Sequence, residues 1–388
     1  MIPYGRQLIS QDDVNAVVDV LHSDYLTQGP TVPIFENAIA DKVGVQFGVA
    51  VSSATAALHI SCLALGLGDG DWLWTSPISF VASANCGLYC SAKVDFIDIN
   101  PKTYNIDIET LKDKLKKAEI IGALPKIIIA VDFAGQSCDM KAIYELSQEY
   151  GFKIIEDASH AIGGKYKNRP VGSCAYCDIA IFSFHPVKII TTGEGGMALT
   201  NNHEIADHLK LLRSHGITRD ASAMEMESPG GWYYEQIDLG FNYRMTDIQA
   251  ALGLKQLEHL DEFISRRREI AEEYSSSLNE LPLILPWQHP DSESSYHLYV
   301  VQIDYTRRSL TRADFFEFMR NNGVNVNVHY IPVYKQPYYK KYGYISDDCH
   351  HAESYYSKCL SLPIYPALTN NDQDKVVELC NEYFKSVI

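Results

Sequence analysis

Basic residues are scarce in this sequence. Its 388 residues include 33 Lys and Arg against 49 Asp and Glu, which gives a formal net charge of −16. A protein that binds nucleic acid nonspecifically needs a basic surface to neutralise phosphates, so we expect no nucleic-acid partner. The net charge describes the whole chain, and it leaves open a locally basic pocket for a small anionic ligand.

Long hydrophobic runs and a secretory signal are also missing. No apolar run approaches the ~18–20 residues that a membrane-spanning helix needs. The N-terminal segment MIPYGRQ contains neither an apolar core nor a small-residue cleavage site. We therefore expect a cytoplasmic protein with no membrane partner.

The cysteines form no recognisable framework. There are nine, an odd number, scattered at positions 62, 86, 90, 138, 174, 177, 349, 359 and 380. A disulfide framework is not expected, which favours a reducing compartment. Cys174 and Cys177 form one C-x-x-C, but a zinc ribbon needs a second pair at suitable spacing. We expect these two residues, and the cluster Cys349-His350-His351, to be ordinary core or loop side chains, and we expect no metal site.

Short apolar runs and amphipathic stretches alternate through the N-terminal two thirds of the chain. Hydrophobic residues make up 46% and charged residues 21%, an ordinary globular composition, and at ~100–200 residues per domain the length predicts two domains. Strands are predicted at 47–52, 72–75, 94–99, 126–133, 152–157, 179–184 and 197–200, and helices at 55–67, 80–89, 108–117, 140–150 and 205–214. This alternation predicts an α/β fold with a largely parallel sheet and helices on both faces.

The alternation of short strands and helices changes in the last third of the chain. Thr246 and Gln249 form a capping box, in which each side chain bonds the backbone of the other residue, so a long helix is predicted from Thr246 towards Tyr274. Beyond it we expect a strand at 297–303, a helix at 312–321, a strand at 324–328 and a terminal helix at 370–384. The predicted domains are a large α/β domain with an N-terminal arm at residues 1–254 and a small α+β domain at 255–388, with the boundary inside the long helix.

Polar residues follow two of the predicted strands. In open α/β sheets, ligands bind at the carboxyl ends of the strands. Asp157 ends one strand, where an acid is either a helix cap or a site residue. Ser183 and His185 end another strand, and Lys188 follows them shortly before a glycine-rich turn. A lysine in that place is either a solvated loop residue, as most lysines are, or a functional group.

A third polar feature lies where the first strand meets the next helix. Ser53-Ala54-Thr55 places free amides and a hydroxyl at a helix N-terminus, which suits an anion, although a plain Thr N-cap explains the same residues. There is neither a dinucleotide fingerprint nor a P-loop, since the glycines at 66, 68 and 70 follow a helix, and this counts against a nicotinamide enzyme. A phosphate on Ala54, Thr55 and Ser183, a lysine that forms a Schiff base and an acid for a pyridinium nitrogen together indicate a pyridoxal 5'-phosphate (PLP) enzyme.

Several motifs occur in order along the chain. They are LTQGP (26–30), SATAAL (53–58), PISFVA (77–82), EDASHA (156–161), SFHPVK (183–188), GEGG (193–196), RSHG (213–216), NYRMTDIQAALG (242–253) and HYIPVY (329–334). From near Tyr4 to near its C-terminus, the chain therefore resembles the DegT–StrS type of nucleotide-sugar aminotransferases. The resemblance implies the fold of PLP-dependent transferases related to aspartate aminotransferase, with a mixed, mostly parallel sheet in the large domain.

The resemblance also implies a role for each candidate residue. Lys188 resembles the lysine that binds PLP, and Asp157 resembles the acid that keeps the pyridine nitrogen protonated. Phe80 matches the aromatic residue that stacks on the cofactor ring, and His160 matches the residue that contacts the hydroxyl side of the ring. The residues that match the phosphate-binding positions are Ala54, Thr55 and Ser183. Asn242 resembles a residue that reaches the phosphate from the second subunit, which implies a homodimer with shared active sites.

The implied reaction has two halves. Glutamate gives up its amino group and leaves as 2-oxoglutarate, and a nucleotide-linked keto sugar then receives that group. One branch of the family performs sugar dehydration and lacks the lysine. A non-enzymatic regulator with this fold should have lost the lysine or the acid. Lys188 and Asp157 therefore favour transamination.

Three motifs resemble the branch that acts on UDP-4-keto-6-deoxy-N-acetylaltrosamine in pseudaminic acid synthesis: SAT at 53–55, PISFVA at 77–82 and SFHPVKIITT at 183–192. WYYEQ at 232–236 departs from that branch and looks more like the wider family. The positions that match the branch's sugar-nucleotide contacts are Tyr4, Tyr25, Leu26, Thr27, Gln28, His329, Tyr330, Ile331 and Pro332. Structural roles stay open for some of them: Tyr4 could pin the N-terminal arm, His329 could be a packed core histidine, and the segment 25–28 could be a plain turn.

Overall fold

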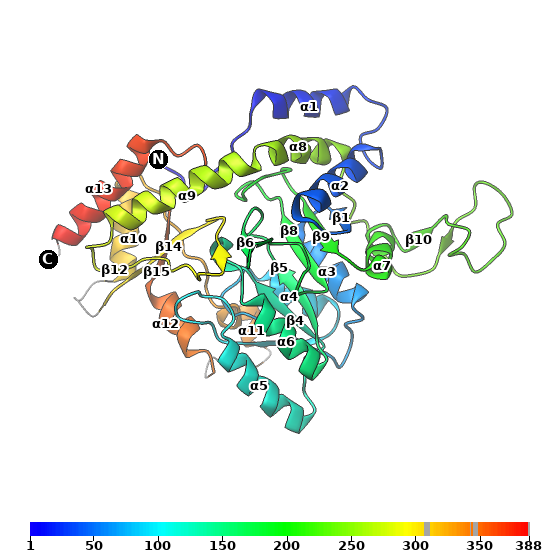
Figure 1. The fold of residues 1–388 in the computed structure, drawn as a ribbon, viewed down its shortest axis with the longest axis horizontal. Coiled ribbons are helices and arrows are strands. Elements are labelled where there is room, and N and C mark those ends of the chain that lie inside the picture. Colours follow the sequence, from blue (N-terminus) through cyan, green and yellow to red (C-terminus); the bar gives the residue numbers. More distant parts are fainter. Residues whose placement is uncertain (306–310, 342, 344–347, 387–388) are drawn as a thin grey trace.

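The computed structural model describes residues 1–305, 311–341, 343 and 348–386, and a seven-stranded sheet lies at its centre (Figure 1). The strands are β1 (Phe47–Val51), β2 (Trp72–Thr75), β3 (Lys93–Phe96), β4 (Ile127–Val131), β5 (Lys153–Asp157), β8 (Ile179–Ser183) and β9 (Gly196–Thr200). Their order is β1-β9-β8-β5-β4-β2-β3, and β9 runs antiparallel to both neighbours whereas the other pairs are parallel. The predicted α/β fold with a mixed, mostly parallel sheet is confirmed.

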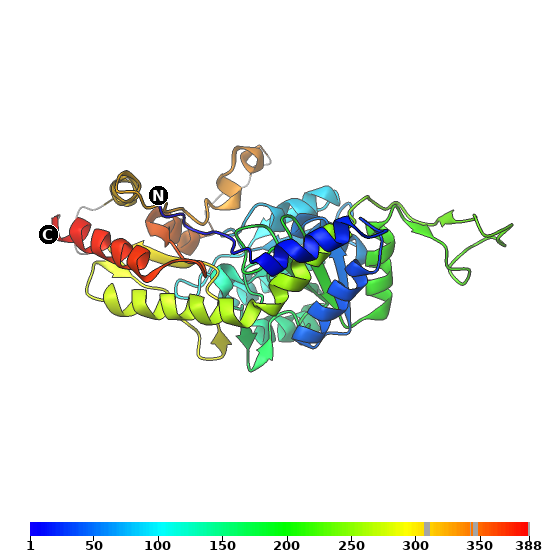
Figure 2. The ribbon, with the colours of Figure 1, turned by 90° about the horizontal axis from the view of Figure 1, so that it is seen from above.

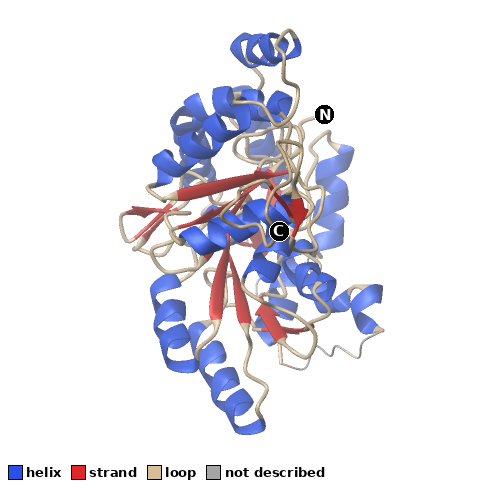
Figure 3. Cartoon of the chain, turned by 90° about the vertical axis from the view of Figure 1, so that its right-hand side faces the viewer, coloured by secondary structure: helices blue, strands red, loops and turns tan. Residues whose placement is uncertain are grey.

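Helices cover both faces of this sheet because its strands are apolar on both sides. In β4, Ile127 and Ile129 join one core cluster and Ile128 and Ala130 join another, as alternation along a strand requires. One face is covered by α3 (Ala54–Ala64), α4 (Ala82–Tyr89) and α7 (His203–Arg213). The other is covered by α2 (Thr31–Val43), α5 (Ile108–Ile121), α6 (Met140–Tyr150) and α8 (Asp247–Glu258), and α1 (Gln11–Leu21) packs on α8. Figure 3 shows the strands enclosed between helices.

The long helix predicted from Thr246 is in fact two helices. Its start is as predicted, since the Gln249 amide donates to Thr246 Oγ1 at 3.2 Å and the Thr246 amide donates to Gln249 Oε1 at 2.9 Å. α8 stops one residue before His259, and α9 (Leu260–Ser277) begins one residue after it. The His259 amide bonds the carbonyls of Gln256 and Leu257, and this tighter turn interrupts the regular helical ladder.

The C-terminal part of the chain forms a second, antiparallel sheet from β12 (Leu283–Ile284), β14 (Tyr299–Ile303) and β15 (Cys359–Leu362). It shares a core with α9, α10 (Arg312–Asn321) and α13 (Asn370–Ser386). α12 (His350–Lys358) contacts β14, and its Ala352 and Tyr355 join the core of the large sheet. The domain boundary placed between residues 254 and 255 falls inside α8 and stays a prediction.

The strand predicted at 324–328 is wrong. Val324 and Asn327 form only isolated bridges, to Ile2 and to Ser361. The Asn327 side chain accepts the Val328 amide at 2.8 Å, and such a local bond competes with a strand ladder.

The remaining elements are short. β6 (Lys165–Tyr166), β7 (Arg169–Pro170) and β13 (Ser292–Glu293) form a small sheet, and the single turns are η1 (Phe133–Gly135), η2 (Val333–Lys335) and α11 (Pro337–Lys340). β10 (Ile217–Thr218) and β11 (Glu235–Gln236) start a hairpin that projects away from the body (Figure 2). Among the described residues, no helix is long and apolar enough to cross a membrane.

Candidate active site

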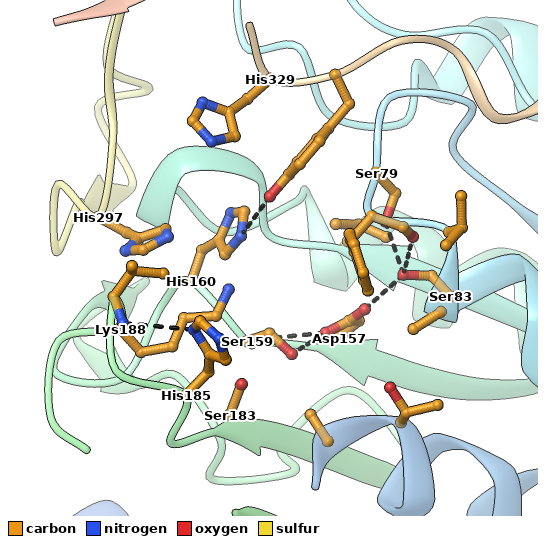
Figure 4. A pocket seen from close by; sticks show the side chains of 18 of the residues that line it. Ser79, Ser83, Asp157, Ser159, His160, Ser183, His185, Lys188, His297 and His329 are labelled. Atoms are coloured by element: carbon orange, nitrogen blue, oxygen red, sulfur yellow. Dashed lines mark hydrogen bonds between the residues drawn. The ribbon is translucent and has the colours of Figure 1, made fainter. Parts of the chain in front are cut away.

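A cavity of about 680 Å³ lies at the carboxyl ends of β5 and β8. This is the place where open α/β sheets bind ligands. Figure 4 shows side chains from distant parts of the sequence turned towards one another in this cavity. The predicted site residues that line it are Tyr4, Ala54, Thr55, Phe80, Asp157, His160, Ser183, His185, Lys188, His329, Tyr330 and Ile331.

Asp157 is the last residue of β5, and three donors hold its carboxylate. Oδ2 accepts the Ser83 hydroxyl at 2.6 Å, while Oδ1 accepts the Ser159 hydroxyl at 2.6 Å and the Ser159 amide at 3.2 Å. The Ser79 hydroxyl bonds that of Ser83 at 2.6 Å, which extends the chain of hydroxyls (Figure 4). A turn follows Asp157 where a capped helix would begin, so the helix-cap alternative is wrong. The arrangement presents a fixed, buried negative charge to any cationic group of a ligand.

The serines around Asp157 were not among the predicted site residues. Ser159 could have been found, because a hydroxyl two residues after an Asp commonly closes a local turn. Ser83 carries no such signal, since it comes from α4, 74 positions away in the sequence. His297, Asn327 and Gln336 from the C-terminal part of the chain also line the cavity, and they were not among the predicted site residues.

Lys188 lies in the turn after β8 and reaches into the cavity. Its amide donates to the His185 carbonyl at 2.9 Å, which fixes the turn. Burial lowers the pKa of the Lys188 ammonium to about 8, and the negative charge of Asp157 opposes part of that shift. Lys188 is half-buried in the cavity wall, which favours a functional group over a solvated loop lysine. Because its pKa is lowered, the neutral form of this amine is far more populated near physiological pH than that of a solvated lysine, so it can act as a nucleophile or a base.

The N-terminus of α3 forms the anion-binding end of the cavity. The Ser53 hydroxyl caps the helix by accepting the Ala56 amide at 3.1 Å, and the amides of Ala54 and Thr55 are the first two of the helix, which cannot bond within it. Gly196 lies so close that a Cβ there would be 2.4 Å from the Ala54 amide nitrogen. Free amides, the Thr55 hydroxyl and the positive end of the helix dipole suit a phosphate.

His160 carries a fixed tautomer. The Ala134 amide donates to His160 Nδ1 at 3.3 Å, so Nδ1 is the acceptor and the ring proton sits on Nε2. Burial, with the nearby charges of Lys188 and His329, holds the His160 pKa well below its usual value, so the ring is neutral. Nε2 is 3.3 Å from the Tyr330 hydroxyl, whose ring is stacked on the imidazole at a 27° interplanar angle. With Nε2–H as the donor in this contact, the Tyr330 O–H is available to donate into the cavity.

His329 is packed and lines the cavity at the same time. Its Nδ1 is 2.7 Å from the Ser361 hydroxyl and its Nε2 is 3.4 Å from the Asn327 amide nitrogen, so both ring nitrogens have partners in the protein. The ring is 5.4 Å from that of Tyr4, and the Tyr4 carbonyl accepts the Ile364 amide, so Tyr4 also pins the N-terminal arm. His329 is therefore a packed histidine and Tyr4 holds the N-terminal arm, and both residues also line the cavity.

Six predicted residues are not brought into the cavity of their own chain. Asn242 is exposed, Pro332 only borders the lining residues, and the remaining four are exposed on the loop before α2: Tyr25, Leu26, Thr27 and Gln28. The Asp247 carboxylate holds that loop by accepting the Gly29 and Thr31 amides at 2.8 Å each. In the described part of the chain, no group of three or more His, Cys, Asp and Glu side chains is placed to hold a metal ion.

The donor set fits a flat, phosphorylated pyridine such as PLP. The same cavity is lined by an acid suited to a ring nitrogen, by helix amides and the Ser183 hydroxyl suited to a phosphate, and by an amine of lowered pKa. Phe80, although a large apolar residue, is 59% exposed and forms part of the cavity wall, where an aromatic ring could cover it.

Comparison with known proteins decides the family. The sequence model of the DegT/DnrJ/EryC1/StrS aminotransferase family matches residues 7–381. The chain belongs to this family. It is accordingly a PLP-dependent sugar aminotransferase, whose substrates are a nucleotide sugar and an amino donor.

Relatives of this aminotransferase match it over almost its whole length. The spore coat polysaccharide biosynthesis protein SpsC of Bacillus subtilis is 39% identical over 387 residues, which cover 99% of this chain and 97% of SpsC. The UDP-4-amino-4,6-dideoxy-N-acetyl-beta-L-altrosamine transaminase of Campylobacter jejuni is 39% identical over 375 residues, which cover 96% of this chain and 94% of that protein.

Solved structures agree with the fold of this aminotransferase. PseC of Helicobacter pylori, an aminotransferase involved in the biosynthesis of pseudoaminic acid, matches with a TM-score of 0.88 at 30% identity, covering 99% of both chains. The PLP form of Spr1654 from Streptococcus pneumoniae matches with a TM-score of 0.89 at 26% identity, covering 100% of this chain and 99% of that one.

Proposed function

We propose that this aminotransferase moves an amino group from glutamate to C4 of a UDP-4-keto-6-deoxy-N-acetylhexosamine of the L-altro type, a step of pseudaminic acid synthesis. The observation that carries the chemistry is the cavity that holds Lys188, its pKa lowered to about 8, together with the buried Asp157. The substrate is supported by the three motifs at 53–55, 77–82 and 183–192, and by the activity after which the Campylobacter jejuni relative is named.

Each half of the site has a separate task in this proposal. When bound, PLP supplies an electron sink for a carbanion at the reacting carbon. The neutral Lys188 amine takes the proton from Cα of glutamate and later returns a proton to C4 of the sugar. Asp157, held by Ser83 and Ser159, keeps the pyridine nitrogen protonated. The amides of Ala54 and Thr55 and the Ser183 hydroxyl hold the phosphate.

The residues on the His160 side orient the ligands. His160 is neutral and donates through Nε2, so it contacts the hydroxyl side of the ring without adding a charge. Tyr330 directs its hydroxyl to an oxygen of the sugar substrate. His329 holds the backbone of the 327–330 segment, because its ring bonds Ser361 and its carbonyl accepts the Tyr355 hydroxyl at 2.6 Å.

A second candidate is transamination of another UDP- or dTDP-linked keto sugar. The segment WYYEQ at 232–236 supports it, since these residues look more like the wider family than like the altrosamine branch. Sugar dehydration and a purely regulatory role are disfavoured, because the cavity contains both Lys188 and Asp157.

The substrate is tested by the release of 2-oxoglutarate from glutamate with three keto sugars: the L-altro and D-gluco UDP-4-keto epimers and a dTDP-4-keto sugar. We expect the L-altro epimer to react at least about 10-fold faster, because a site built to hydrogen-bond one arrangement of hydroxyls leaves polar groups unpaired with another. The Lys188→Ala protein measures the background in each assay. Equal rates on all three sugars would refute the L-altro assignment and leave the transaminase activity standing.

We also propose a homodimer in which Asn242 and the loop at 25–28 serve the partner's cavity. Neither lines the cavity of its own chain, and the two segments lie close together, because Thr27 forms a bridge with Thr246, four residues after Asn242. The Ser52 amide donates to the Tyr243 carbonyl at 2.8 Å, which ties the segment around Asn242 to the start of α3.

The shared site is tested by mixing two inactive variants, Lys188→Ala and Asn242→Asp. Random reassociation makes half of the dimers hybrids, and each hybrid has one complete site, so about a quarter of the wild-type activity should return. Light scattering should give about twice the 43.6 kDa of one chain. If mixing restores nothing, or the protein is a monomer, the shared site is wrong.

A further inference from the structure

Three cysteines and a histidine meet between α3 and α4, outside the residues that line the cavity. His59 and Cys62 are three residues apart on α3, and Cys86 and Cys90 are four apart at the C-terminal end of α4, so each pair lies on one face of its helix. The two helices pack together, and the three thiols belong to one buried core cluster. All three are free thiols.

The contacts within this cluster, which we call the α3–α4 thiol cluster, are not equivalent. The Cys62 side chain interacts with both Cys86 and Cys90, whereas the Cys86 thiol also donates to the Ser83 carbonyl at 3.4 Å. The Tyr243 hydroxyl is 3.2 Å from His59 Nδ1, and with Tyr243 as the donor the His59 proton sits on Nε2. His59 can then donate to Cys90, with which its side chain interacts.

These contacts separate Cys90 from the other thiols. Its interaction with the Cys62 thiol, and then that with the His59 side chain, lower the pKa of Cys90 to about 6, against the opposing effect of burial. Its place at the C-terminal cap of α4 also opposes a negative charge, because the helix dipole is negative there. Burial and the neighbouring thiols raise the pKa of Cys62 well above its usual value. A thiolate beside a protonated thiol is the pairing that thiol–disulfide chemistry requires.

A metal site is the first alternative for three cysteines and a histidine, since this is a common zinc ligand set. Within the described residues, however, the cluster is not placed to hold a metal ion. All three thiols are buried, but Cys62 and Cys86 are 0% exposed whereas Cys90 is 8% exposed, so Cys90 is the least buried of the three. This graded access suits a small oxidant.

We propose that Cys90 is an oxidation site of this enzyme and that Cys62 is its resolving thiol. The Cys90 thiolate attacks hydrogen peroxide, its sulfur takes one oxygen to form a sulfenic acid, and the other oxygen leaves as water after protonation. The Cys62 sulfur then displaces the sulfenic oxygen as a second water, which forms a Cys62–Cys90 disulfide. Two thiols and one peroxide give one disulfide and two waters, so the electrons balance.

The position of this bond connects it to the site without placing it in the cavity. It would join the C-terminal end of α4 to the last turn of α3. The other end of α3 carries the Ala54 and Thr55 amides, and α4 carries Ser83, which holds Asp157. The proposal does not depend on the identity of the sugar substrate.

The test treats the full-length holoenzyme with equimolar hydrogen peroxide at pH 7 and maps its peptides without reduction. We expect a protein about 2 Da lighter and a single cross-linked peptide pair that contains Cys62 and Cys90. Cys90→Ser should abolish both changes. Cys62→Ser should instead give a product about 16 Da heavier, the unresolved sulfenic acid. Cys380→Ser, at a thiol buried in the C-terminal core, is the matched control and should behave as wild type.

A second measurement does not depend on the disulfide. Alkylation of Cys90 by iodoacetamide, followed by mass spectrometry, should rise with pH through a midpoint of about 6, and Cys380 should not react in the folded protein. A midpoint at the ordinary thiol value of about 8.5 would overturn the proposal. So would a first cross-link between Cys174 and Cys177, or a Cys90 that stays reduced in a tenfold excess of peroxide.

Discussion

Replacing Lys188 by alanine is expected to lower turnover by at least about 10⁴-fold, because the substitution removes both the covalent attachment of PLP and the base that moves the proton. Single-turnover measurements of the glutamate half-reaction check this result. The Lys188→Ala protein should also lack the cofactor absorbance that the wild type retains after gel filtration. Lys141→Ala, at an exposed lysine on α6, is the matched control and should keep wild-type turnover.

The pH dependence of cofactor uptake tests the same lysine without turnover. Only the neutral amine attacks an aldehyde, and a buried lysine with a lowered pKa becomes neutral at lower pH than a solvated one. The rate at which PLP binds covalently to the apoprotein should therefore rise with pH through a midpoint of about 8. A midpoint near the ordinary lysine value of about 10.4 would contradict the burial of Lys188. Turnover that survives in Lys188→Ala would contradict its role as the base.

Replacing Asp157 by asparagine is expected to slow the glutamate half-reaction by roughly 10²–10⁴-fold, the range for losing a group that controls a proton in the reaction. Asparagine keeps the size of the side chain, and its one oxygen can still accept either the Ser83 or the Ser159 hydroxyl, while its NH2 group can donate to the oxygen of the other. It has no charge to keep the pyridine nitrogen protonated. The effect should therefore lie in the rate of proton removal and not in folding. Stopped-flow absorbance and a thermal melt measure the two separately.

Two further variants make the Asp157 result specific. Ser83→Ala removes one of the three donors and leaves the charge, so its effect should be smaller, about 10-fold. Asp113→Asn, at an exposed carboxylate on α5, should change nothing. If Asp157→Asn reacts with glutamate as fast as the wild type, then Asp157 is not the partner of the ring nitrogen.

Much of the fold could be predicted because it depends on local pattern. The run Ile127–Val131 is apolar at every position, as a strand covered on both faces must be, and the capping box at Thr246 marks the start of α8. The capping box of Ser10 and Asp13 marks the start of α1 in the same way, although α1 is not among the predicted helices. The break at His259 and the missing strand at 324–328 depend on single hydrogen bonds of the folded backbone, which no periodicity reports.

The sequence alone determined the class of the fold and the family of the enzyme. Alternating apolar runs dictate an α/β sheet, and the motifs around Asp157 and Lys188 identify a PLP-dependent sugar aminotransferase, since both signals lie in consecutive residues. Only the tertiary structure decided how these residues are tuned. The pKa of Lys188 follows from burial, and the carboxylate of Asp157 is held by Ser83 from another helix. The α3–α4 thiol cluster likewise exists only because two helices pack. Desolvation and contacts between distant segments belong to the folded chain, and no stretch of sequence encodes them locally.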